Sequence, residues 1–232
     1  MAEIIDQDQW GICGFVSVLN GLRAAGLLTK VSNDGDEELS LEEIQTRLYA
    51  EIVTYLKYLV FTKSPLVKQI EEISYHLAPE GEPKRDMQQL IQYIEMRLRD
   101  IVKKTVGEQN IRQGMRNLIT EKIKENGVTV AMTPDALVDY MKWAGVKNAL
   151  NLDVKSTQNT GNNLLAYKNC VIGIGEKSGK DAFYNGLEHW IYVDESGVLN
   201  NWGTKTELKP NQQGTQLFGT WAIFITHVIK MA

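Results

Sequence analysis

Residues 189–202 read HWIYVDESGVLNNW, two β-rich runs on either side of Asp194-Glu195-Ser196-Gly197, which is typical of a tight hairpin turn. Further short β-rich runs occur at residues 169–174 and 220–228. Upstream of about residue 165, apolar residues recur at helical spacing instead. Because helices are predicted first and strands last, we expect an α+β fold with an antiparallel sheet, not alternating βαβ units.

The helical part of the chain begins at Cys13, which opens an apolar segment that is predicted to be a buried helix. Four more helices are indicated, by capping patterns or by apolar spacing: after Ser40 and Glu43, after Asp86, over 111–123, and from Thr133-Pro134 to Gly145.

Composition excludes several classes of protein. The chain of 232 residues is 43% hydrophobic and 23% charged, as in ordinary globular proteins, and its net charge of −4 argues against a nucleic-acid partner. No apolar run approaches the roughly 20 residues that span a bilayer, and no secretory signal opens the chain. We therefore expect a soluble protein, cytoplasmic or exported without a cleaved signal peptide, with no membrane insertion.

The two cysteines and three histidines restrict the possible chemistry. They are too scattered for a zinc site, and we expect neither a metal nor a cofactor. Cys13 lies at a helix N-terminus, where the helix dipole and a nearby imidazole favour a thiolate at neutral pH. His189, which begins a strand, is a better base candidate than His76 or His227, and Cys170 fits a core position.

A side chain that orients the imidazole would complete such a site. If the turn pairs Asp194 with Gly197, Asn200 becomes a diagonal neighbour of His189, and Asn201 points the other way. A one-residue change in the turn would reverse this assignment. Asp194 has a sufficient role as a turn residue.

An amide donor is also needed to hold the oxyanion of a tetrahedral intermediate, together with the backbone amide of the nucleophile. Gln7 can loop back toward Cys13 to supply it, and Gln9 is the rival candidate.

A resemblance to the papain-like cysteine peptidase clan is carried by the run Gln7-x-x-x-Gly11-x-Cys13-Gly14, followed much later by His189 and then Asn200-x-Trp202-Gly203. The glycine after Cys13 and the closing order of strand, Gly-x-x-His-Trp segment, hairpin and apolar strand resemble the bacteriocin-processing (double-glycine leader) peptidases. The resemblance implies that Cys13 is the nucleophile, His189 the general base and acid, Asn200 the group that orients the imidazole, and Gln7 the oxyanion-hole donor.

The same resemblance implies a single papain-like catalytic domain over residues 1–232. Its helical N-terminal lobe, 1–145, would carry the nucleophile at a helix N-terminus and contain a large helical insertion at about 40–127. The C-terminal antiparallel β-sheet lobe would span 165–232. The insertion has no counterpart in either peptidase branch.

Three functions are compatible with these residues. The first is a cysteine hydrolase that cleaves a peptide or amide bond through a thioester, with a protein or peptide as its substrate. The second is a glutamine or asparagine deamidase or a transglutaminase, of the kind found among bacterial effectors and toxins, whose helical insertion docks a protein. The third is an interaction module on an inactive papain-like core. The sequence specifies neither the substrate nor the oligomeric state.

Overall fold

The computed structural model describes residues 11–25, 41–106, 128–152, 157–158, 160–177, 179, 182–201 and 203–231. Within these residues, one antiparallel sheet has the strand order β1-β7-β3-β4-β5-β6, and the short β2 also pairs with β7. The strands are β1 (Ala149–Leu152), β2 (Thr157–Gln158), β3 (Cys170–Gly175), β4 (His189–Val193), β5 (Val198–Asn201), β6 (Thr204–Glu207) and β7 (Phe224–Met231).

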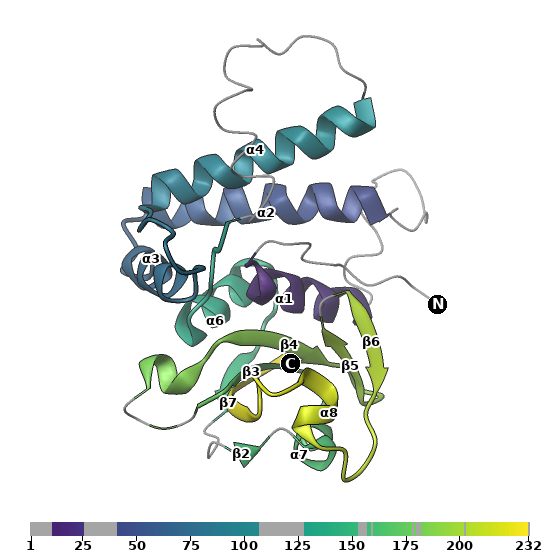
Figure 1. The fold of residues 1–232 in the computed structure, drawn as a ribbon. Helices are drawn as coiled ribbons and strands as arrows, with labels where there is room; N and C mark the ends of the chain where they lie inside the picture. The colour runs from purple at the N-terminus through teal and green to yellow at the C-terminus, as the bar shows by residue number, and fades with distance from the viewer. Residues whose placement is uncertain are drawn as a thin grey trace.

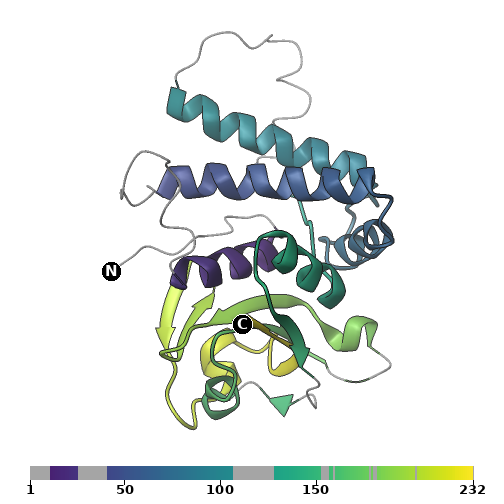
Figure 2. The same ribbon diagram turned by 180° about the vertical axis from the view of Figure 1, so that it is seen from behind.

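The helices cover both faces of this sheet. They are α1 (Cys13–Ala24), α2 (Leu41–Phe61), α3 (Leu66–His76), α4 (Met87–Val106), α6 (Pro134–Trp143), α7 (Gly161–Leu165) and α8 (Gly214–Phe218), with a short 3₁₀ turn, η2 (Phe183–Gly186). Figure 1 shows α1 and α6 on one side of the sheet and α7 and α8 on the other, with α2 and α4 stacked beyond α1. The view from behind shows the same layers (Figure 2). The predicted α+β class is therefore confirmed.

The central strands are buried on both faces because helices cover both. Along β4, Trp190 and Tyr192 pack into the cluster that contains α1, whereas Ile191 and Val193 pack into a second cluster on the opposite face. Successive side chains of a strand alternate between faces, so a strand covered on both sides reads as a continuous apolar run. This explains why the run at 189–193 is recognisable in the sequence.

The predicted helix and strand positions agree with the structure where their signals are strong. Cys13 begins α1, and Thr133 caps α6, accepting a hydrogen bond from the backbone N–H of Ala136 at 3.2 Å. The last strand runs over Phe224–Met231 instead of 220–228, and the sheet includes three strands that the sequence did not indicate, β1, β2 and β6. The expected helix over 111–123 and the cap at Ser40 lie outside the described residues.

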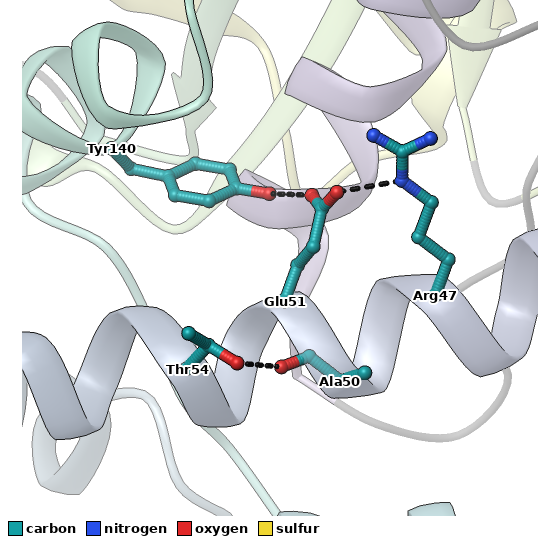
Figure 3. Close-up of polar contacts among 5 residues, drawn as sticks. All are labelled: Arg47, Ala50, Glu51, Thr54 and Tyr140. Atoms are coloured by element: carbon teal, nitrogen blue, oxygen red, sulfur yellow. Dashed lines mark hydrogen bonds and ion pairs between the residues drawn. The ribbon is translucent and has the colours of Figure 1, made fainter. Parts of the chain in front are cut away.

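Partly buried polar contacts join the predicted helical insertion to α6. The Glu51 carboxylate of α2 accepts hydrogen bonds from the Tyr140 hydroxyl of α6 at 3.3 Å and from Nε of Arg47 at 2.7 Å (Figure 3). One turn further along α2, the Tyr55 hydroxyl donates to the Asp139 carboxylate of α6 at 2.9 Å. The insertion and α6 thus share one packed interior instead of forming separate units.

Candidate active site

A pocket opens where the N-terminus of α1 meets the start of β4. Its cavity of about 310 Å³ falls at the lower end of the range typical of ligand sites. The residues that line it come from widely separated parts of the chain: Gly11, Cys13, Leu77, Thr129, Glu188, His189 and Trp221. The fold therefore brings Cys13 and His189, which are far apart in the sequence, to the same cavity.

Cys13 is fixed at this pocket by close backbone packing on both sides. At Gly14, a Cβ would lie 2.9 Å from Cγ of Met132, so only glycine allows α1 to approach this closely. At Gly11, a Cβ would lie 2.8 Å from the Thr129 side chain. Glycine is required at positions 11 and 14 because a larger residue would collide with Thr129 or Met132.

A parallel β-bridge holds the residues just before Cys13. The Gly11 N–H donates to the Val128 carbonyl at 3.2 Å, and the Val130 N–H donates to the Gly11 carbonyl at 3.0 Å. The same segment is tied to β4, since Nε1 of Trp190 donates to the Met132 carbonyl at 2.9 Å. One segment, 128–132, therefore connects the residues before the thiol to the strand that carries the imidazole.

The thiol of Cys13 is protonated at neutral pH. Burial raises its pKa to about 11, and the backbone N–H groups of Trp190, Gly14 and Cys13 itself lower it by less. The expectation of a thiolate at neutral pH was wrong for this conformation, because loss of water around the sulfur outweighs the helix N-terminus.

His189 is neutral and held in one orientation. Its Nε2 lies 2.8 Å from Oδ1 of Asn201, and since an amide oxygen can only accept, Nε2 carries the proton. Burial lowers the pKa of His189 to about 4, with this hydrogen bond opposing the shift. The ring of Trp221 packs edge-on against the imidazole at 5.9 Å between centroids. Because Nε2 carries the proton, the lone pair of the neutral imidazole is on Nδ1.

The prediction that Asn200 is the partner of His189 was wrong by one residue in the hairpin register. The structure pairs Tyr192 with Asn200, and the Asp194 N–H donates to the Val198 carbonyl at 3.0 Å. The loop is one residue longer than the two-residue turn assumed from the sequence. Because alternate residues face opposite sides, this single step turns Asn200 away from His189 and brings the next residue to it.

The residues of this turn have other partners. The Asn200 amide donates to the Val198 carbonyl at 3.2 Å. Asp194 accepts from the backbone N–H groups of Ser196 and Val198, each at 2.9 Å, which is a turn-stabilising pattern. Gly197 adopts a φ of +87°, a left-handed conformation that suits the end of a three-residue hairpin loop.

The remaining sequence candidates lie elsewhere. Gln7, its rival Gln9, and Trp202 fall outside the described residues. Cys170 is 2% exposed within the cluster on the far face of the sheet and does not line the pocket. Burial raises its pKa to about 11, as expected of a core thiol.

Sequence reasoning missed several residues of the pocket wall. Glu188 stands directly before His189, so its position was a signal that could have been used. Leu77, Thr129 and Trp221 reach the pocket through long-range packing, and no local pattern marks them.

Among the described residues, no group of three or more His, Cys, Asp and Glu side chains is arranged to hold a metal ion. The helices of the described segments include none that is both long and apolar enough to cross a membrane. Comparison with family models, curated proteins and solved structures found no match for this chain.

Proposed function

We propose that this protein is a cysteine hydrolase of papain-like arrangement that cleaves a peptide or other amide bond. Cys13 is the nucleophile in this proposal, His189 the general base and acid, and Asn201 the group that orients the imidazole. The observation that carries it is the shared pocket of Cys13 and His189, with the imidazole bound to Asn201 at 2.8 Å.

The neutral state of both groups suits a mechanism in which proton transfer accompanies attack. As the sulfur bonds to the substrate carbonyl carbon, Nδ1 of His189 takes the thiol proton. The backbone N–H of Cys13 lies in the first turn of α1, where N–H groups have no intrahelical partner, and it donates to the oxyanion in this mechanism. The imidazolium then gives its proton to the departing amine, which leaves a thioester.

Water completes the cycle by attacking the thioester carbonyl. His189 removes a proton from this water and returns it to the leaving thiolate, which restores the neutral pair. Throughout the cycle Asn201 accepts from Nε2–H, which keeps the lone pair of the ring on Nδ1.

Peptidyl acyloxymethyl ketones provide a test that requires no known substrate, because they alkylate a thiol that is assisted by a neighbouring imidazole. Intact-mass analysis should show one adduct on the native protein and on Cys170→Ala, and none on Cys13→Ala. Equal labelling of the two cysteines, or none of Cys13 by any peptide sequence, contradicts the proposal, and the latter result favours an inactive interaction module.

A second candidate is a deamidase or transglutaminase that uses the same residues on a glutamine or asparagine side chain. It is favoured by the exposed apolar residues of α2 and α3, since Phe61 is 88% and Tyr75 51% exposed and neither helix has a role in the chemistry. Phenylalanine and tyrosine are enriched at protein–protein interfaces relative to the rest of the surface. Mass analysis of a treated protein distinguishes the two, because deamidation adds about one dalton and leaves the backbone intact.

A further inference from the structure

The walls of the pocket differ in chemical character. Leu77 and the indole of Trp221 provide apolar surface, and Thr129 provides a hydroxyl. Glu188 is the one acidic side chain among the described residues that line the cavity. A carboxylate beside apolar and aromatic surface suits a ligand group with an apolar stem and a cationic head.

Glu188 is held in place by one hydrogen bond within the described residues, which leaves part of its accepting capacity unused there. Its Oε2 accepts from the Glu176 N–H at 3.2 Å, and no ion pair joins it to a cation within the described part of the chain. Partial burial, and to a lesser extent the Glu176 carboxylate, raise the pKa of Glu188 above its ordinary value, while the Glu176 N–H, Lys177 and His76 oppose this shift. A cation bound at Oε1 would therefore relieve the cost of keeping a charge in the pocket.

From this arrangement we infer that Glu188 selects substrates with a lysine or arginine side chain close to the scissile amide. The cationic group pairs with the Glu188 carboxylate, and the methylene stem lies against Trp221 and Leu77. The inference rests on the proposed function, because it assigns the substrate of that same pocket.

The experiment uses three peptidyl acyloxymethyl ketones that differ in a single side chain: arginine, its neutral isostere citrulline, or glutamate. The side chain is placed in turn at the first, second and third position from the electrophile. The second-order rate of Cys13 alkylation is measured by intact mass. At one position, arginine should react about tenfold faster than citrulline, and glutamate more slowly than either.

Variants of Glu188 test whether this residue causes the preference. Glu188→Gln keeps an acceptor for the Glu176 N–H and should bring the arginine and citrulline rates together. Glu188→Lys should favour glutamate. Glu195→Gln removes an exposed carboxylate in the hairpin turn, at the end of β4 away from His189 and outside the pocket lining, and is the matched control, with the native preference expected.

The results distinguish a wrong role for Glu188 from a wrong hydrolase proposal. If Cys13 reacts with all three probes at equal rates at every position, the role of Glu188 is refuted and the hydrolase proposal stands. The same holds if the arginine preference survives in Glu188→Gln. If Cys13 reacts with none of the probes, the hydrolase proposal itself is refuted.

Discussion

Replacing Asn201 by alanine removes the hydrogen bond between its Oδ1 and Nε2 of His189, which favours the tautomer with the proton on Nε2. His189 is only 6% exposed, so water cannot readily replace the lost acceptor. An unsatisfied buried N–H costs about 1–3 kcal/mol, and each 1.4 kcal/mol corresponds to about a tenfold change in rate. We therefore expect Asn201→Ala to slow alkylation of Cys13 by a peptidyl acyloxymethyl ketone by about 10- to 100-fold.

Asn200→Ala is the matched control, because Asn200 is the adjacent residue of β5 and is buried, whereas Asn201 is partly buried. Loss of its bond to the Val198 carbonyl should lower the free energy of unfolding by about 1 kcal/mol and leave the alkylation rate unchanged. Stability alone does not separate the two variants, so the decisive measurement is the ring itself. Long-range ¹H–¹⁵N spectra should place the His189 proton on Nε2 in the native protein and in Asn200→Ala, but not in Asn201→Ala.

The reverse pattern would refute this reasoning. If Asn200→Ala lost both the Nε2 tautomer and the reactivity of Cys13 while Asn201→Ala kept them, the hairpin register and the role given to Asn201 would both be wrong.

Three further predictions concern stability and packing. Burial lowers the pKa values of His189 and His227 to about 4, so between pH 6.5 and 4 these histidines are protonated in the unfolded chain but not in the folded one. The free energy of unfolding should therefore fall over this range by about 1–3 kcal/mol per histidine. Urea denaturation that showed no change in stability over this range would contradict the prediction. Gly14→Ala should destabilise the protein by about 1–3 kcal/mol and slow alkylation at the pocket, because its Cβ would displace the N-terminus of α1. Tyr55→Phe should cost about 1–2 kcal/mol in urea denaturation through loss of the bond to Asp139 and leave the alkylation rate unchanged; a slower rate would show that α2 influences the pocket.

The sequence predicted those elements whose signals are local. The run at 189–193 is apolar on both faces, and Thr133-Pro134 carries its own cap, so β4 and the start of α6 match the structure. The strand β6 consists of Thr204, Lys205, Thr206 and Glu207 at a sheet edge. An edge strand needs no apolar alternation, so no hydrophobic pattern indicated it. The helices α7 and α8 have five residues each, too few to show a helical period.

The site was predicted in its main groups but not in its details. Cys13 and His189 were chosen because their residue types and order are typical of thiol hydrolases, and both line the pocket. Asn201 was not chosen because loop length is weakly encoded, and one extra residue in the hairpin changes which side chain faces the ring. The thiolate was wrongly expected because the degree of burial, which raises the pKa of Cys13 to about 11, depends on segments distant in sequence.

The β-bridge between Gly11 and Thr129 links the pocket to the segment that follows the helical region 40–127. The chain departs from the pocket along α1, passes through α2, α3 and α4, and comes back at Thr129 as one of its walls. If residues 40–127 were replaced by a linker, the pocket around Cys13 would form only if the linker allowed Thr129 to pair with Gly11. The helical region therefore contributes to the shape of the pocket. We expect a shortened region to move Thr129 relative to Cys13 while leaving Cys13 and His189 themselves unchanged.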